Sequence, residues 1–233
     1  MKISVIIPTF NEADNIGCLI ESLKIYGEKH LHEIIIADSP NSTDTTKEIA
    51  QKLGAIAQKS PQKGRAFQMN FGTSIATGEI LYFVHADVKV NPDYAFDILK
   101  AINNGHDFGC YRYQFDTDDW LLKVNAFCTR MPFIWCRGGD QTLFIRKKDF
   151  LKVGKFRDDY QIMEDYEFII RAKKVLKFKI IPKNVIVSAR KYKTNSYLRV
   201  QKANLKVMRM FLSGKASQEE MMETYHRMLD YRE

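Results

Sequence analysis

Short apolar runs and longer amphipathic segments alternate along the first half of the chain. This alternation is typical of a parallel sheet wound with helices, because strands that are buried on both faces are apolar throughout. The expected strands are Ile3 to Ile7, Ile34 to Ala37, Ala55 to Ala57 and Ile80 to Val84. The expected helices are Glu12 to Tyr26, Ser42 to Leu53, Gly64 to Thr77 and Pro92 to about Asn103. Gly54 is placed to end the second of these helices and Pro92 to begin the fourth at its first helical position.

The pattern loosens after Asp107, where we expect the parallel winding to end. The segments expected next are an aromatic strand ending at Phe115, a helix from Asp118 to Arg130, a turn at Gly138 and Gly139, and a strand from Thr142 to Arg146. The last ones are a helix from Glu164 to Val175, a strand from Val185 to Ser188, a helix from Tyr197 to Leu212, and a helix opened by a capping box of Ser217 and Glu220. The predicted fold class is α/β, a mostly parallel sheet flanked by helices, with a helical C-terminal tail.

A chain of 233 residues suits one large domain. We expect residues 1–195 to form it and residues 196–233 to be a helical extension packed on it, with Asn195 at the boundary. No apolar run approaches the roughly 18 residues of a membrane span. The four cysteines lack zinc-ligand spacing, so we interpret them as reduced core thiols of a cytoplasmic protein.

Charge is unevenly distributed along the chain. The net charge is +8, and the segment from Arg171 to Lys215 carries fourteen Lys or Arg residues and no Asp or Glu. Such a block predicts an anionic partner, which could be substrate phosphate, a lipid surface or nucleic acid, unless it is only a solvated face.

Acidic residues stand at the ends of three expected strands. Glu12 follows the first, Asp38 ends the second and Asp87 follows the fourth. Ligands of wound α/β sheets bind outside the carboxyl ends of the strands, so we expect these side chains to converge. Each one alone is more often a helix cap or turn residue. Converging acids repel one another unless a cation joins them, and hard divalent ions bind carboxylate and phosphate oxygens together.

Glycine-rich phosphate loops are missing from this sequence. No G-x-G-x-x-G follows the first strand, although Asp38 lies where a ribose-binding acid of a dinucleotide site would be, and no G-x-x-x-x-G-K-S/T occurs. Dinucleotide and P-loop chemistry are therefore excluded. Any bound phosphate must be held by cations.

Six segments, in this order, carry a resemblance to a known family: VIIPTFNE, IIIADSPNSTDTT, KGRAFQMNFG, YFVHADVKV, GGDQTLFIRKKDF and MEDYEF. Over its first 190 residues the chain resembles family 2 glycosyltransferases with the GT-A fold, in particular the small soluble bacterial members with HAD, GDQ and MED motifs. The resemblance implies an inverting, non-processive transfer of a sugar from a UDP- or GDP-sugar to a hydroxyl or lipid-phosphate acceptor.

The resemblance also implies roles for the matching residues. Those implied to bind the nucleotide are Pro8, Thr9, Glu12, Asp38, Lys63, Arg65 and His85. Asp87, the last acid of the D-x-D motif, is implied to ligate a Mn²⁺ or Mg²⁺ ion that bridges the two phosphates, and Asp165 is implied to be the catalytic base. Those implied to line the donor sugar and the acceptor are Asp140, Gln141 and Glu164.

Two positions depart from the family pattern. His85 replaces the first acid of D-x-D, so we expect only modest metal affinity. Arg190 stands where many members have a late metal-binding histidine, and we expect it to clamp phosphate directly. The Q-x-x-R-W signature of processive synthases is absent, so a polymer product is not expected.

The proposed base has an alternative explanation. Glu164 and Asp165 open a helix, where the helix dipole favours acids in any protein. A hydroxyl acceptor must lose a proton as it attacks, which requires a base such as Asp165. A lipid phosphate is already an anion and needs none, in which case Asp165 would orient a ligand or bind metal instead.

Two rival functions come from other classes. A nucleotidyltransferase-like enzyme would also hold metal and nucleotide with acids, but its glycine-rich loop is absent. A basic peripheral-membrane or nucleic-acid-binding protein without catalysis would explain the charge block and leave the ordered acids unexplained. We therefore do not expect nucleic acid as a partner.

The segment from Tyr197 to Leu212 has the pattern of a basic amphipathic helix. The basic residues on one face are Arg199, Lys202, Lys206 and Arg209, and the apolar stripe is Val200, Val207, Met208 and Phe211. One interpretation is peripheral contact with an anionic membrane. The other is that the stripe packs on the domain's own core or on a second subunit of a homodimer while the cations face water.

Overall fold

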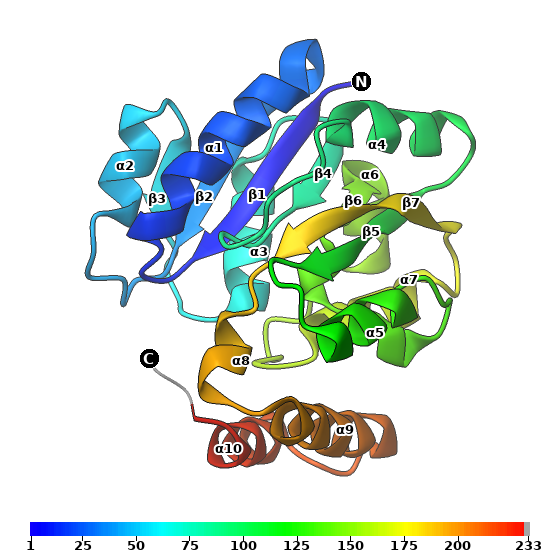
Figure 1. The fold of residues 1–233 in the computed structure, drawn as a ribbon. Helices are drawn as coiled ribbons and strands as arrows, with labels where there is room; N and C mark the ends of the chain where they lie inside the picture. Colours follow the sequence, from blue (N-terminus) through cyan, green and yellow to red (C-terminus); the bar gives the residue numbers. More distant parts are fainter. Residues whose placement is uncertain (231–233) are drawn as a thin grey trace.

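The computed structural model describes residues 1–230. Within them a seven-stranded sheet with the order β3-β2-β1-β4-β6-β5-β7 forms the centre of the molecule (Figure 1). The strands are β1 (Ile3–Thr9), β2 (Leu31–Asp38), β3 (Ile56–Lys59), β4 (Ile80–Phe83), β5 (Phe108–Phe115), β6 (Leu143–Arg146) and β7 (Phe178–Val187). The first four are parallel, β6 runs antiparallel to β4 and β5, and β7 is parallel to β5. The predicted mostly parallel sheet, with its winding ending after β4, is confirmed.

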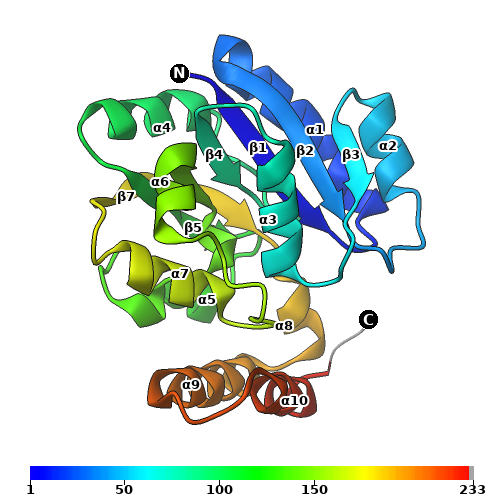
Figure 2. The same ribbon diagram turned by 180° about the vertical axis from the view of Figure 1, so that it is seen from behind.

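Helices cover both faces of this sheet (Figures 1 and 2). The helices are α1 (Ala13–Gly27), α2 (Thr46–Lys52), α3 (Arg65–Ile75), α4 (Tyr94–Asn103), α5 (Trp120–Cys128), α6 (Lys147–Val153), α7 (Glu164–Ala172), α8 (Arg190–Thr194), α9 (Tyr197–Ser213) and α10 (Gln218–Met228). Single turns of 3₁₀ helix are Glu28–His30, Ile134–Cys136 and Gly139–Gln141. The sequence pattern missed α6 and α8, because five or seven residues are too few to show a helical period.

The two faces of β1 belong to two different hydrophobic clusters. Ile3, Val5 and Ile7 pack with apolar residues of α1 and α4, whereas Ile6 packs with residues of α3, α6 and α7. Successive side chains of a strand point to opposite faces, so both faces of β1 are buried. This explains the continuous apolar run in the sequence and holds the ends of β1, β2 and β4 in fixed positions.

Helices α2 and α4 begin later than predicted because side chains hold the preceding loop in a turn. The amide Oδ1 of Asn11 accepts a hydrogen bond of 2.8 Å from the backbone of Thr43, and Asp44 accepts one of 3.0 Å from the backbone of Thr46, where α2 begins. In the same way Asn91 accepts a hydrogen bond of 3.0 Å from the backbone of Asp93. Pro92 therefore lies in an Asx turn before α4 and not at its first helical position.

The C-terminal helices lie together at one end of the molecule, beyond α8 (Figures 1 and 2). The capping box of Ser217 and Glu220 is present, as predicted. Phe211 of α9 contacts the rings of Tyr160 and Tyr166 in the body of the protein. The division at residue 195 stays a prediction, and residues 231–233 of the predicted extension lie outside the described residues.

The apolar stripe of α9 faces the protein. Val200, Val207 and Met208 are buried, and Phe211 is half-buried against the two tyrosines. Arg199 forms an ion pair with Asp230 and so does not face water freely. The stripe that suggested a membrane contact is therefore an internal packing surface, as in the second interpretation of this helix.

All four cysteines are free thiols, but the expectation that they lie in the core is wrong for three of them. Cys110 is buried, Cys136 is half-buried, and Cys18 and Cys128 are exposed. Among residues 1–230 there is no helix with the length and apolar character that crossing a membrane requires.

Candidate active site

The carboxyl ends of β1, β2 and β3 bring together a buried acid and its partners. Thr9 and Asp38 are register partners, and the Thr9 hydroxyl donates a hydrogen bond of 2.8 Å to Asp38. Lys59, the last residue of β3, places its ammonium 2.7 Å from the other carboxylate oxygen of Asp38. Asp38 is 1% exposed, so this lysine compensates a buried negative charge. Together we call Thr9, Asp38 and Lys59 the nucleotide-side cluster.

Backbone contacts fix the edge around this cluster. The amide of Gln68, on α3, donates hydrogen bonds to the carbonyls of Thr9 (2.9 Å) and Ala37 (2.6 Å). Pro8 is the register partner of Ala37, which places the start of the predicted nucleotide loop against β2. Asn11 has a positive φ of 52°, a conformation that asparagine tolerates better than most residues. These contacts fix the strand ends on which Thr9 and Asp38 lie.

Arg190 joins two of the predicted acids across a long sequence distance. Its guanidinium lies 3.1 Å from Glu12 and 3.2 Å from Asp87. Partial burial alone would lower the pKa of Arg190, but the charge of Asp87 and the hydrogen bond to Glu12 outweigh it and raise the pKa. A permanent positive charge thus stands between two carboxylates at the carboxyl ends of β1 and β4.

Within residues 1–230 no group of three or more His, Cys, Asp or Glu side chains has the geometry of a metal site. Glu12 and Asp87 can supply two carboxylates, and Arg190 lies between them. Mg²⁺ and Mn²⁺ sites that take most of their ligands from water and substrate phosphate need only one or two protein carboxylates. The residues therefore fit an ion that arrives with a diphosphate and do not form a metal cage of their own.

A second group of charged residues lies at the loops around β4, β6 and α7. His85 Nδ1 is 3.5 Å from Asp140, and Arg65 is 3.4 Å from Glu164. Glu164 and Asp165, the first residues of α7, are 3% and 8% exposed. We call these five residues the catalytic-side cluster.

The charges of this cluster perturb one another. Burial, and then the neighbouring charge of Glu164, raises the pKa of Asp165 to about 7. Burial would lower the pKa of His85, but its hydrogen bond with Asp140 and the charges of Asp140 and Asp165 raise it. Despite some desolvation, the hydrogen bond and charge of His85 hold the pKa of Asp140 well below its usual range. A carboxyl group with a pKa near 7 can both accept and release a proton at neutral pH.

Several buried polar atoms near this cluster lack hydrogen-bond partners among the described residues. Both amide atoms of Gln141 and the hydroxyl of Thr142 are buried and have no such partner. Buried polar groups are normally satisfied, and exceptions need an explanation. A cavity of about 10 Å³, lined in part by His85 and Asp165, lies in the same region. The arrangement is what a site completed by its ligand would look like.

The structure thus brings together the predicted site residues, with one exception. Lys63 is exposed in the loop before α3, and no hydrogen bond or ion pair involving it is found within residues 1–230. Two cations were missed. Lys59 could have been found, because it ends the strand that was predicted to start within Ala55 to Ala57. Lys191, whose charge helps to lower the pKa of Asp140, directly follows Arg190.

Tyr225 of α10 was also missed, and no sequence signal could have placed it. Its hydroxyl lies 3.0 Å from the ammonium of Lys191, which also lies 5.6 Å from the centre of the Tyr225 ring. The C-terminal helices therefore help to position a cation beside the catalytic-side cluster.

Comparison with known proteins decides the family. Residues 4–181 match the model of glycosyl transferase family 2. The chain belongs to glycosyltransferase family 2. A dolichol-phosphate mannosyltransferase of Pyrococcus furiosus is 31% identical over 112 residues, which cover 46% of this chain. The aligned part is 32% of that mannosyltransferase, so this glycosyltransferase matches only about a third of that relative's length.

Solved structures show the same fold. TarS of S. aureus (residues 1–349), in complex with UDP-GlcNAc, has a TM-score of 0.67 and 18% identity, over 98% of this chain and 71% of that one. The mannosyltransferase PcManGT of Pyrobaculum calidifontis, in complex with GDP-Man and Mn²⁺, has a TM-score of 0.66 and 17% identity, over 97% and 68%. At such identities the likeness carries the fold alone. The predicted GT-A fold is confirmed.

Proposed function

We propose that this glycosyltransferase transfers a sugar from a UDP- or GDP-sugar to an acceptor in a single inverting, non-processive displacement. The observation that carries the proposal is the convergence of two different clusters on one sheet edge. The nucleotide-side cluster is charge-balanced, whereas the catalytic-side cluster holds a buried carboxyl group with a pKa of about 7. The relatives solved with UDP-GlcNAc and GDP-Man support this choice of donor.

The nucleotide-side cluster suits a base that offers an N–H group next to a carbonyl. Uracil and guanine both do so. In the proposal Asp38 accepts the base N–H, and the ammonium of Lys59, 2.7 Å away, lies against its other carboxylate oxygen. In the proposal the remaining predicted nucleotide ligands contact ribose and phosphates, and for Lys63, which is exposed in the loop before α3, this rests on the family resemblance alone. These ligands are Pro8, Thr9, Glu12, Lys63, Arg65 and His85.

Charge on the leaving diphosphate must be balanced as its bond to the sugar breaks. Arg190 is already charged and stands between Glu12 and Asp87, where it could turn toward the phosphate oxygens. A divalent ion bound with the diphosphate at Asp87 would neutralise the same charge. Stabilisation of developing charge is usually the largest catalytic term.

The acceptor hydroxyl is deprotonated by Asp165 in this proposal. The acceptor oxygen forms its bond to the anomeric carbon while the bond from that carbon to the diphosphate oxygen breaks, and the hydroxyl proton moves to Asp165. A pKa near 7 keeps a large fraction of Asp165 ionised at neutral pH. Asp140, Gln141 and Glu164 would contact the donor sugar and the acceptor. A lipid-phosphate acceptor would need no such proton transfer.

Calorimetry with UDP and with GDP, each with and without Mn²⁺, tests the donor class. Micromolar binding of one nucleotide, clear preference between the two bases and an increase in affinity with Mn²⁺ are expected. Equal, weak and salt-sensitive binding of all nucleotides would identify a charge-driven binder and refute the proposal.

Four free thiols suit the reducing cytoplasm, where we place the enzyme.

A further inference from the structure

The outer side of α9 carries a row of exposed leucines. Leu198, Leu205 and Leu212 are 67%, 52% and 54% exposed and are spaced seven residues apart. Seven residues make almost two helical turns, so the three side chains form one line along the helix. The internal stripe that contains Val200 and Val207 lies on the opposite side. The helix thus has two apolar faces, and only the inner one is covered by the described part of this chain.

Cations accompany the leucine row. Lys202, Lys206 and Arg209 are exposed, and no ion pair involving them is found within residues 1–230. At 100° per residue Lys202 and Arg209 fall beside the leucines and Lys206 lies further around the same side. No residue of α9 is acidic. The outer face of α9 therefore combines a row of exposed leucines with neighbouring cations that have no acidic partner among residues 1–230.

We propose that this outer face of α9, formed by Leu198, Leu205, Leu212, Lys202, Lys206 and Arg209, binds an anionic membrane surface. Leucines that enter the headgroup boundary beside cations that contact anionic lipids are the arrangement of interfacial helices. The inference does not depend on the identity of the donor or the acceptor.

Charge favours a membrane over a second copy of the chain. Packing the outer face of α9 against itself would bring cations of two copies together with no acid on the helix to separate them. An anionic lipid surface instead offers many negative groups that rearrange around each cation.

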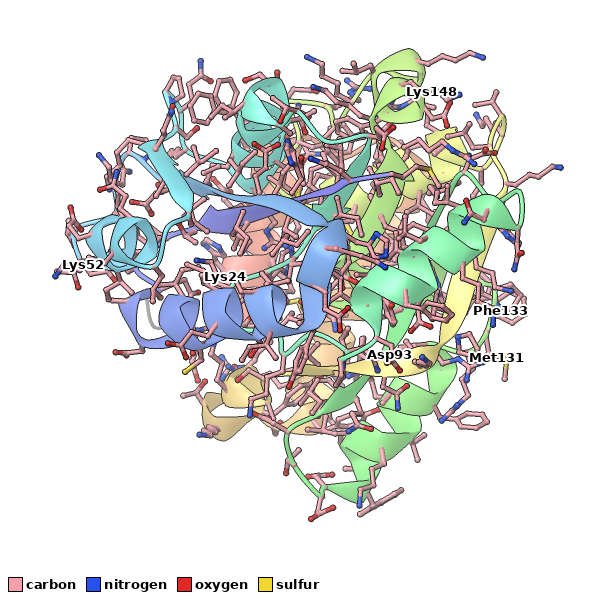
Figure 3. The ribbon with its side chains drawn as sticks, turned by 90° about the horizontal axis from the view of Figure 1, so that it is seen from above. Lys24, Lys52, Asp93, Met131, Phe133 and Lys148 are labelled. Atoms are coloured by element: carbon pink, nitrogen blue, oxygen red, sulfur yellow. The ribbon has the colours of Figure 1, made fainter. Side chains whose placement is uncertain are left out.

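Another set of exposed apolar residues is larger but has charges of both signs beside it, because Lys123 pairs with Asp118 and Arg130 lies over the Phe127 ring. Its members are Trp120, Val124 and Phe127 on α5 and Met131, Phe133 and Trp135 after it. Figure 3 shows Met131 and Phe133 at the edge of the molecule. Asp116, Asp118 and Asp119 precede Trp120 and are exposed. These acids would be repelled by an anionic surface, so α9 is the better candidate.

The position of α9 would orient the enzyme. Arg190, in α8, contacts Asp87 at the active site, and α9 begins shortly after α8. Figures 1 and 2 place α9 and α10 beyond α8, at the end of the molecule toward which β1 points. A membrane bound at α9 would therefore lie on the side of the sheet where the strands carry the candidate active site (Figure 1).

Vesicle co-sedimentation of the full chain tests the proposal. We expect binding to vesicles containing about 30% phosphatidylglycerol at low salt, weak binding to pure phosphatidylcholine vesicles, and release at high salt. The triple variants Leu198→Gln, Leu205→Gln, Leu212→Gln and Lys202→Gln, Lys206→Gln, Arg209→Gln should each lower the partition coefficient on the order of tenfold to a hundredfold. All six side chains are exposed, so both variants should keep the wild-type melting temperature.

Matched controls separate this face from general surface properties. Lys52, Lys148 and Lys152 are exposed cations elsewhere, the first two labelled in Figure 3, and their change to Gln removes the same charge. Ile25, Phe96 and Val175 are exposed apolar residues elsewhere, and their change to Ser is the apolar control. Both controls should bind vesicles like wild type.

Three outcomes would overturn the proposal. They are equal sedimentation of wild type and both α9 variants, loss of binding on changing Trp120 and Phe127 to Ser instead, and a dimer in sedimentation velocity that the leucine variant dissociates. The first would leave the face without a lipid role, the second would move the contact to α5, and the third would assign the face to a second copy. Donor binding in solution should be unchanged in all α9 variants, so a failure here differs from a failure of the proposed activity.

Discussion

The nucleotide-side and catalytic-side clusters lie on the same sheet edge but are built on different principles. Asp38 has a partner on each carboxylate oxygen, Thr9 on one and Lys59 on the other. Asp165, in contrast, is buried beside Glu164, another acid, and its pKa is raised to about 7. In the first cluster the charge of Asp38 is balanced by its own partners. In the second, two neighbouring buried acids repel each other, and a substrate or a proton can relieve this repulsion. The difference is that between a site that holds a group in place and a site that carries out a reaction.

The largest expected effect is on the catalytic side. Asp165→Asn preserves the shape of the side chain and removes its basicity, so kcat with a hydroxyl acceptor should fall by about 10²- to 10⁴-fold while donor affinity is retained. Steady-state kinetics and donor calorimetry on the same preparation measure both. An unchanged kcat with a confirmed hydroxyl acceptor would contradict the base assignment, and retained turnover of a lipid phosphate would point to the other acceptor class.

The same variant should also change how the free energy of unfolding depends on pH, in the absence of substrate. The pKa of Asp165 is raised in the folded state, so the folded protein binds more protons than the unfolded chain between about pH 4 and pH 7, and wild-type stability falls as the pH rises through this window. Asp165→Asn does not titrate and escapes this loss. Its advantage over wild type should be small at about pH 4 and grow to on the order of 4 kcal/mol at about pH 8.

Thermal melts across this pH range measure the difference, with Asp14→Asn as the control. Asp14 is exposed in the first turn of α1, so its substitution controls for the loss of one carboxylate that is not buried beside another acid. A gap between Asp165→Asn and wild type that does not change with pH would show that Asp165 is an ordinary carboxylate and that the contrast between the clusters is wrong.

The nucleotide side should respond to loss of its cation in the opposite way. Lys59→Met leaves one oxygen of Asp38, which is 1% exposed, without its cationic partner, so the folded state should lose about 1–3 kcal/mol. Lys59 itself is 38% exposed, which keeps the loss at the lower end of that range. Chemical denaturation measures it, and Lys52→Met on the exposed side of α2 is the control. Equal stability of the two variants would remove Lys59 from the cluster.

Sequence patterns identified one cluster more completely than the other for a physical reason. A strand-end acid such as Asp38 is local information, and the acids after β1, β2 and β4 were therefore expected to converge. Lys59 was missed because the apolar run of β3 ends before the strand does, although its position also follows from the strand-end rule. Tyr225 could not be found, because only the packing of α10 brings it to Lys191.

Amphipathic pattern alone was misleading for α9. The stripe with Val200 and Phe211 packs inward, and the exposed face is the leucine row. A sequence with two apolar lines on one helix does not indicate which line the rest of the chain will cover. For Arg190, the departure from the expected histidine indicated a cation near phosphate, but only the fold showed it between Glu12 and Asp87.

The smallest expected effect concerns the boundary between the clusters, where Arg190 and a divalent ion compete for Asp87. Because the guanidinium lies 3.2 Å from this carboxylate, it must move or share Asp87 when an ion binds with the diphosphate. In wild type, Mn²⁺ should therefore increase the affinity for the nucleoside diphosphate only modestly. Arg190→Gln should weaken metal-free binding, because a phosphate-binding cation is lost. The same change should enlarge the enhancement by Mn²⁺ about tenfold, because Asp87 is no longer neutralised.

Calorimetry with and without Mn²⁺ on four proteins measures this competition as a double-mutant cycle. The four are wild type, Arg190→Gln, Asp87→Ala and the double variant. Asp87→Ala should remove the enhancement by Mn²⁺ in both backgrounds, because it removes the carboxylate for which the ion and the guanidinium compete. If instead Mn²⁺ enhances binding equally in wild type and in Arg190→Gln, the ion and the guanidinium bind independently. Arg190 would then belong to the pre-built nucleotide side, because its charge would hold Glu12 and Asp87 in place without opposing the metal.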